Sequence, residues 1–273
     1  MRRPGLFAAQ LVFTLLVAAF LAVPIAMSIV AGFTQNFFFG VASGLTTRWV
    51  AEVWTRYGDT VLFSLAIAFF CLAINLVIGI PAAYVLAKRR NTVTRMFEEL
   101  IVLPVAVPGL ATALALVMVY GRFGDFRTSG AFILVGHVVY TLPFMVRSVL
   151  AVLSSIDLRL LEEGAASLGA GFWQKIFTIA LPNAMPGILA GSLMVVTLSI
   201  GEFNLTLLLS TPLTQTMPVG LAVAYTNSRL ELGSAYTLLF FVIIIPLLVA
   251  LQLWGNPSRA RKARPLLAEG DER

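Results

Sequence analysis

Residues 161–182 read LEEGAASLGAGFWQKIFTIALP and lie between two long apolar stretches. The segment itself is too polar to cross a bilayer, which takes roughly 20 mostly apolar residues. Residues 164–166 are small, so another protein's backbone can approach a helix closely there. We expect Gly169 to break this first short helix, Phe172 to open a second, and Leu181-Pro182 to stop it. Two short helices at the membrane surface form a docking element rather than a catalytic one.

The rest of the chain has the composition of a membrane protein. Of its 273 residues 59% are hydrophobic and 12% are charged, whereas soluble domains average about 25% charged residues. A membrane β-barrel shows alternating segments of about 10 residues, but these apolar runs are continuous, so only helices fit. We predict an all-α polytopic protein with six spans, at residues 7–33, 60–87, 98–120, 131–153, 186–210 and 235–255.

The distribution of Lys and Arg predicts the orientation. The side with both termini and the 154–185 loop carries thirteen, the opposite side carries five and Arg147 lies in a span, which accounts for all 19. Since cytoplasmic loops carry the excess of basic residues, both termini and that loop are expected to be cytoplasmic. The net charge of +6 therefore reflects membrane orientation and does not indicate nucleic acid.

We expect three regions along the chain. Residues 1–59 hold the first span and an extracytoplasmic loop, 60–256 form a core of five spans that includes the 154–185 loop, and 257–273 form a polar tail. The first apolar run is too long for a typical signal peptide.

Most catalytic chemistry is excluded. The chain has one histidine, His137, and one cysteine, Cys71, so neither a multi-histidine metal site nor a disulfide framework is expected. No phosphate-binding G-x-x-x-x-G-K-[ST] loop, His-Glu-x-x-His or Gly-x-Ser-x-Gly pattern occurs. We therefore expect no catalytic residue, metal or cofactor. Any energy from a nucleotide would have to come from a partner protein.

Polar residues inside spans are costly and usually functional. Glu202, Asn204 and Asn75 are therefore candidates for lining a translocation path, although Glu202 could equally make a structural hydrogen bond to a neighbouring helix. His137 is expected to make a hydrogen bond between helices. Residues 104–109 contain two prolines that break the third span, either towards a cavity or as a packing kink.

The 161–182 segment resembles the "EAA" coupling loop of permease subunits in bacterial ABC importers. That loop has Glu, two small residues, Gly six positions after the Glu, and Leu-Pro after an amphipathic segment. The matching residues are Glu163, Gly164, Ala165, Gly169, Leu181 and Pro182, with Gly164 in place of the first alanine. From about residue 60 to 250 the chain resembles a type I importer permease.

The resemblance implies a subunit of the bacterial inner membrane without enzymatic activity of its own. It implies a cytoplasmic ABC ATPase dimer, a second identical or homologous permease, an extracytoplasmic solute-binding protein and surrounding lipid as partners. We expect Phe172, Trp173 and Ile176 to form a knob that enters a groove on the ATPase. Glu163 is expected to begin or stabilise the preceding helix and to offer its carboxylate to a basic partner residue. A membrane-surface amphipathic segment is the alternative.

Residues 201–203 and 214–220 resemble permeases of the polyamine, phosphonate and ferric-iron group. A polyamine or 2-aminoethylphosphonate is the expected solute, with ferric iron or another small solute of the same superfamily as the alternative. A stand-alone secondary transporter is the competing class, and it would not need the 161–182 segment.

Overall fold

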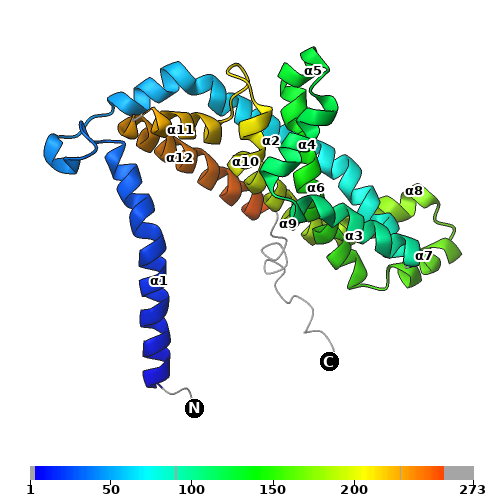
Figure 1. Cartoon of the computed structure of the whole chain (residues 1–273). Helices are drawn as coiled ribbons and strands as arrows, with labels where there is room; N and C mark the ends of the chain where they lie inside the picture. The colour runs from blue at the N-terminus through cyan, green and yellow to red at the C-terminus, as the bar shows by residue number, and fades with distance from the viewer. Residues whose placement is uncertain (1–3, 90, 228, 255–273) are drawn as a thin grey trace, which may run out of the picture. The chain divides into compact units, whose positions relative to one another are not determined.

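A computed structural model describes residues 4–89, 91–227 and 229–254, and this part of the chain is helical without a regular strand (Figure 1). The expected 257–273 tail lies outside the described residues. The elements are α1 (Pro4–Ala31), η1 (Gly40–Ser43), α2 (Arg48–Lys88), α3 (Thr92–Ala106), α4 (Gly109–Tyr120), α5 (Gly124–Thr128), α6 (Gly130–Ser154), α7 (Leu158–Ser167), α8 (Phe172–Lys175), η2 (Ile176–Ala180), α9 (Leu181–Gly201), α10 (Asn204–Leu209), α11 (Met217–Thr226) and α12 (Leu230–Trp254).

The helices confirm the predicted set of spans. Five are long and apolar enough to cross a membrane, and α3 with α4 makes a sixth if the pair counts as one broken span. Several bounds differ from the prediction. Helix α3 begins at Thr92 rather than at residue 98, α12 begins at Leu230 rather than at residue 235, and the helical run of the fifth span begins at Phe172 rather than at residue 186. Helix α2 already begins at Arg48, inside the expected 34–59 loop, and α9 ends at Gly201 rather than at residue 210.

The third span is bent by 101° between α3 and α4. Val107 is extended at the break, with φ −91° and ψ 131°, and Pro108 is the N-cap of α4. A proline restricts the preceding residue to extended conformations and cannot donate a backbone N–H, so the helix must end there. Pro104, by contrast, lies inside α3.

The described helices belong to two compact units. One comprises residues 4–62 and 217–243, and the other comprises 63–216 and 244–254. In the first unit Tyr57 and Tyr236 pack with ring centroids 5.4 Å apart. The apolar stretch of α1 has none of its residues buried.

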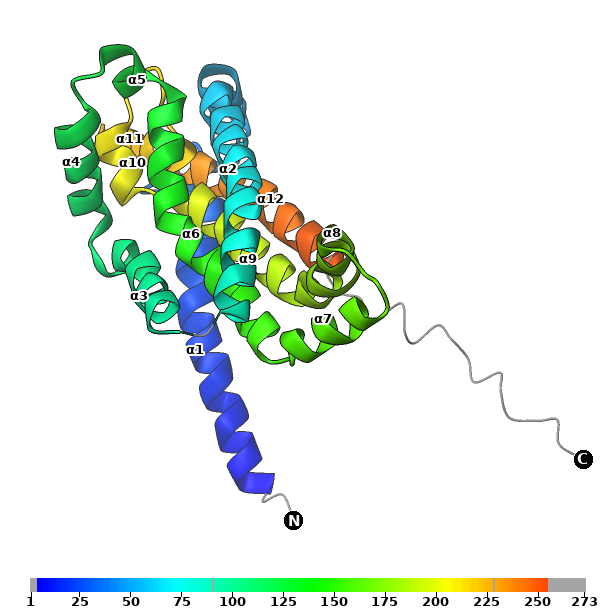
Figure 2. The same ribbon diagram turned by 90° about the vertical axis from the view of Figure 1, so that its right-hand side faces the viewer.

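In the second unit α6 and α9 pack at very short range (Figure 2). A Cβ atom at Gly187 would lie 2.5 Å from the carbonyl oxygen of Ser148, and one at Gly191 would lie 2.8 Å from the sulfur of Met145. Small residues allow such close backbone approach, which is the main attraction available to helices in lipid. The two helices therefore form one packed core.

Buried polar side chains link the helices of this core. His137 of α6 lies 2.9 Å from Ser199 Oγ and 2.8 Å from Thr206 Oγ1, so the predicted interhelical hydrogen bond is confirmed. Asn75 of α2 donates to Thr141 Oγ1 of α6 at 3.0 Å. Such bonds satisfy polar groups that would otherwise be stranded in an apolar interior.

Candidate functional site

Helix α7 is a well-capped short helix. Its N-cap is Asp157, whose carboxylate accepts a hydrogen bond from the backbone N–H of Leu160 at 3.1 Å. At its other end Gly169 has φ +84°. The Gly169 N–H donates to the Ala166 carbonyl and the Ala170 N–H to the Ala165 carbonyl, at 2.9 and 3.0 Å. This pair of backbone hydrogen bonds is a Schellman motif, and it confirms the predicted break at Gly169.

Of the two expected roles of Glu163 in this helix, beginning it is wrong, because Asp157 caps the helix and Glu163 lies within it. The other role, stabilising the helix, agrees with its ion pair. The Glu163 carboxylate is 61% exposed and pairs with Arg159, one turn earlier, at 2.7 Å. An exposed i,i+4 pair on a helix contributes about 0.3–0.5 kcal/mol. The carboxylate is therefore weakly held and accessible to a basic group from outside.

The adjacent carboxylate, Glu162, faces inward and was missed from the sequence. Its side chain is 5% exposed and lies 2.6 Å from Lys88 Nζ. Tyr84 donates its hydroxyl to Glu162 at 2.6 Å. Burial raises the pKa of Glu162, but the hydrogen bonds from Lys88 and Tyr84 outweigh it and hold that pKa below its ordinary value. We call these three residues the α2–α7 clamp.

The opposite face of α7 is open. A Cβ atom at Gly164 would meet nothing within 4 Å. Leu160 and Leu168 are 64% and 88% exposed. Since the chain's own packing does not require a small residue at 164, the small, partly apolar face is available to another protein, as the sequence suggested.

The predicted helix stop at Leu181-Pro182 is wrong. A single helical run extends from Phe172 to Gly201, and its turn from Ile176 to Ala180 is π-helical. A proline removes one regular i→i−4 hydrogen bond from a helix. A π-helical turn also interrupts this hydrogen-bond pattern by widening the helix, and such turns are frequent at functional sites. The Asn183 side chain adds a bond to the Ile179 carbonyl at 2.7 Å. The segment that begins at Phe172 is thus continuous with α9.

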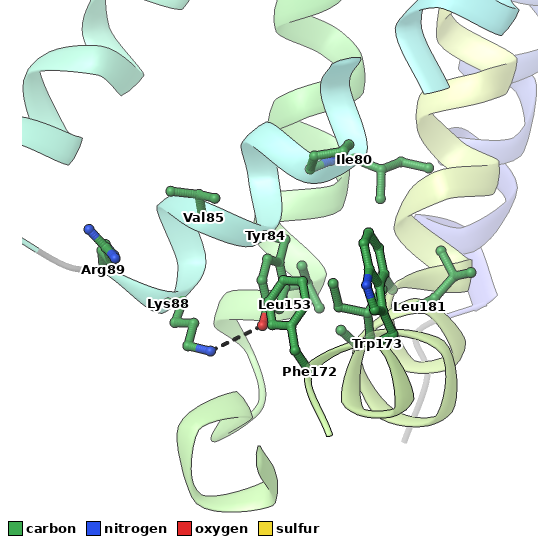
Figure 3. Close-up of a pocket in the computed structure, with 13 residues that line it drawn as sticks. Ile80, Tyr84, Val85, Lys88, Arg89, Leu153, Phe172, Trp173 and Leu181 are labelled. Carbon is green, nitrogen blue, oxygen red and sulfur yellow. Dashed lines mark hydrogen bonds between the residues drawn. The ribbon is translucent and has the colours of Figure 1, made fainter. Parts of the chain in front are cut away.

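Phe172, Trp173 and Ile176 line a cavity of about 390 Å³ against the end of α2. Figure 3 shows Phe172 and Trp173 across from Ile80 and Tyr84. Phe172 and Trp173 remain 53% and 68% exposed. The expectation that these side chains enter a groove on the ATPase stays a prediction; within the chain itself they form one wall of a cavity.

The path candidates Glu202 and Asn204 lie at the break between α9 and α10. The Glu202 carboxylate accepts from the Leu205 N–H at 2.6 Å, so its hydrogen bond is to the next helix of the same segment. A Cβ atom at Gly109 would lie 3.4 Å from Asn204 Cβ and 3.6 Å from Glu202 Oε1. The break before α4 therefore meets the break before α10. Asn75, by contrast, is fully buried in the core, and its Oδ1 has no hydrogen-bond partner in the described structure.

Curated relatives of similar sequence are transport permeases. The molybdenum transport system permease protein ModB of Escherichia coli K12 is 26% identical over 222 residues, which cover 76% of this chain and 96% of ModB. A putative 2-aminoethylphosphonate transport system permease protein, PhnV of Salmonella typhimurium, is 26% identical over 251 residues, which cover 91% and 94%. The sulfate permease CysW of Synechocystis is 27% identical over 207 residues, which cover 69% and 74%.

Solved structures share the fold. A bacterial ABC transporter that imports the polysaccharide alginate matches with a TM-score of 0.71 and 16% identity, over 96% of this chain and 98% of that one. The methionine transporter MetNI matches with a TM-score of 0.60 and 17% identity, over 76% and 95%. A family model described as the binding-protein-dependent transport system inner membrane component covers residues 76–256. The chain therefore belongs to this family of multi-pass transport permeases.

Proposed function

We propose that this chain is the translocation subunit of an importer driven by a separate cytoplasmic ATPase, which docks on α7 and the Gly169 turn. The observation that carries the proposal is the open small-residue face at Gly164, where a Cβ atom would meet nothing. Glu163, one residue earlier, offers an exposed carboxylate to a basic side chain of the ATPase. Leu168, 88% exposed, supplies apolar area beside them.

Two connections carry motion from α7 into the membrane. The α2–α7 clamp ties Glu162 to the end of α2 through Lys88 and Tyr84. The uninterrupted run from Phe172 to Gly201 makes α8 and α9 one lever, and α9 packs directly on α6 at Gly187. A displacement of α7 by the ATPase therefore moves α2 and α9 together, because tightly packed elements shift as rigid bodies.

The two helix breaks are the proposed lining of the translocation path. Discontinuous helices expose backbone groups near the middle of the bilayer, where transporters bind their solutes. Glu202 and Asn204 sit at one break and Gly109 at the other, so close that a Cβ atom added at Gly109 would be in van der Waals contact with both. Asn75 is buried, so it can line the path only in a conformation in which its unpaired Oδ1 becomes accessible.

The assembly proposed has both termini in the cytoplasm and a second permease, identical or homologous, beside this one. A solute-binding protein delivers the solute on the other side, to the loops around 34–59, 121–130 and 211–234. ATP hydrolysis belongs to the ATPase, so this chain has no enzymatic activity of its own.

For the solute we propose a small anion that contains phosphorus, sulfur or molybdenum, with 2-aminoethylphosphonate favoured. The match to PhnV spans 91% of this chain and 94% of PhnV, and ModB and CysW are named for molybdenum and sulfate. The Glu202 carboxylate suits the ammonium group of an aminophosphonate. Polyamines and ferric iron are the alternatives.

Co-purification of the ATPase with two variants at one position tests the docking proposal. Gly164→Ala keeps a small side chain, and we expect wild-type recovery of the ATPase. Gly164→Leu adds a bulky side chain at a position where a Cβ atom meets nothing within 4 Å, and we expect the ATPase to be lost while the permease still inserts. Normal binding and solute uptake by Gly164→Leu would instead favour a stand-alone transporter.

A further inference from the structure

The cavity between α2 and α8–α9 has a mostly apolar lining, and its charged lining residues are all cationic. Its walls are apolar, with Ile80, Val85 and Leu181 among them, and the cationic residues Lys88 and Arg89 line it as well (Figure 3). Val85 is 48% exposed, so the apolar part is open to the surroundings of the span. Trp173, whose residue type is enriched at membrane interfaces, forms part of the wall.

A second, polar cavity of about 330 Å³ adjoins the first and shares Lys88 and Arg89 with it. Its charged lining residues are Lys88, Arg89, Arg159, Lys175, Glu162 and Glu163.

Two of these four cations are already neutralised. Lys88 pairs with Glu162 at 2.6 Å, and Arg159 pairs with Glu163 at 2.7 Å. Within the described residues Arg89 and Lys175 take part in no ion pair. The shared mouth therefore has an excess of two positive charges beside an apolar slot.

The backbone holds Arg89 at this mouth. Its N–H donates to the Val85 carbonyl at 3.0 Å, which continues α2 by one residue. Its carbonyl accepts a hydrogen bond from the Thr94 hydroxyl, and Asn91 with Thr94 forms the capping box that starts α3. The turn between two helices thus fixes the position of the Arg89 backbone.

We propose that this site binds one anionic phospholipid, with an acyl chain in the apolar cavity and the phosphate between Arg89 and Lys175. A free anion would leave the apolar cavity unused, and an apolar segment of a partner protein would leave the two cations unpaired. Basic pockets beside membrane-spanning helices bind anionic headgroups in this way. This lipid site goes beyond the proposed transport role. The proposal does not depend on which solute the permease carries. A bound lipid would contact α2 and α8 at once, next to the α2–α7 clamp.

Fluorescence quenching of Trp173 tests the proposal in the full-length chain. A variant with Trp49, Trp54 and Trp254 changed to Phe keeps Trp173 as the single tryptophan. It is placed in phosphatidylcholine nanodiscs that contain a few dibrominated lipids, either phosphatidylglycerol or phosphatidylcholine. Since each cation near a headgroup contributes about fivefold in lipid affinity, we expect the brominated phosphatidylglycerol to associate about 25-fold more tightly.

Substitutions separate the headgroup from the acyl chain. Arg89→Gln and Lys175→Gln should each lower the preference for phosphatidylglycerol about fivefold, whereas Arg122→Gln, outside both cavities, should not change it. Val85→Phe fills the slot and should lower quenching by both lipids, and Val77→Phe on the same helix is its control. Equal quenching by the two lipids, or a preference that survives in the Arg89→Gln, Lys175→Gln double variant, overturns the proposal. Loss of the preference in excess inorganic phosphate, but not in sodium chloride of equal ionic strength, assigns the cations to a free anion and overturns the lipid as occupant.

Discussion

The same mild substitution should destabilise the chain much more at one of two adjacent carboxylates of α7 than at the other. Glu162 is 5% exposed and receives two hydrogen bonds of 2.6 Å, from Lys88 and Tyr84. Loss of a hydrogen bond to a charged group costs about 1.5–3 kcal/mol. Because Lys88 is itself 38% exposed and keeps access to water, we expect Glu162→Gln to cost about 2 kcal/mol of unfolding free energy. For a chain of this size that cost lowers the melting temperature by about 4–8 °C.

Glu163→Gln is the matched control, on the same helix and with the same chemical change. Its ion pair with Arg159 is exposed, so the cost should stay below about 0.5 kcal/mol, or roughly 1–2 °C. The assay is thermal unfolding of each purified variant, followed by tryptophan fluorescence and repeated with the co-purified ATPase. Glu163→Arg should lose the ATPase on co-purification, while the lost ion pair and the new like-charge pair with Arg159 together cost less than about 1 kcal/mol.

The pH dependence gives a second readout of the α2–α7 clamp. The Glu162 pKa is depressed in the folded chain, so its stabilisation is complete above the ordinary pKa of a glutamate and is lost as pH falls through the depressed value. The difference in melting temperature between wild type and Glu162→Gln should therefore stay constant from neutral pH down to about pH 5 and shrink below it. Equal melting temperatures for Glu162→Gln and Glu163→Gln at neutral pH would refute the assignment of the inward carboxylate.

Three further substitutions and one control, Gly164→Ala, probe other elements. Gly187→Ala adds a Cβ atom 2.5 Å from the Ser148 carbonyl oxygen, so the melting temperature should fall by an amount equivalent to about 1–3 kcal/mol, while Gly164→Ala should leave it unchanged or higher. Gly169→Ala, at φ +84°, should cost about 1–2 kcal/mol; an unchanged melting temperature would show that the turn relaxes. Glu202→Gln should lower uptake in vesicles while membrane insertion, followed by the yield of membrane-bound protein, stays normal; unchanged uptake kinetics would remove Glu202 from the path.

The spans and the glycine break were predictable because they depend on local chemistry. Continuous apolar runs mark the membrane helices, and Gly169 marks a chain reversal that few other residues tolerate. The same local logic failed at Pro182, since a π-turn before it lets the helix continue. A sequence gives no direct sign of such a turn, because its geometry depends on the packing around it.

The motif also could not show which of Glu162 and Glu163 is the buried carboxylate. Glu162 follows Leu158 by four residues, and both are buried, so helical spacing could have indicated the inward side. The partners of Glu162, however, are 74 and 78 residues away in the sequence. The meeting of the helix breaks at Gly109 and Glu202 is likewise a long-range contact. Contacts of this kind come from tertiary packing, which local patterns do not encode.

ATP-driven solute uptake in vesicles tests the central claim most directly. The vesicles contain this permease with its ATPase and binding protein, and wild type is compared with Glu163→Arg. If α7 couples the subunits, the variant should insert normally and lose less than about 1 kcal/mol of stability, but take up no solute when ATP is added. ATP-driven uptake by Glu163→Arg at the wild-type rate would contradict the account, because transport would then not depend on the exposed carboxylate face of α7.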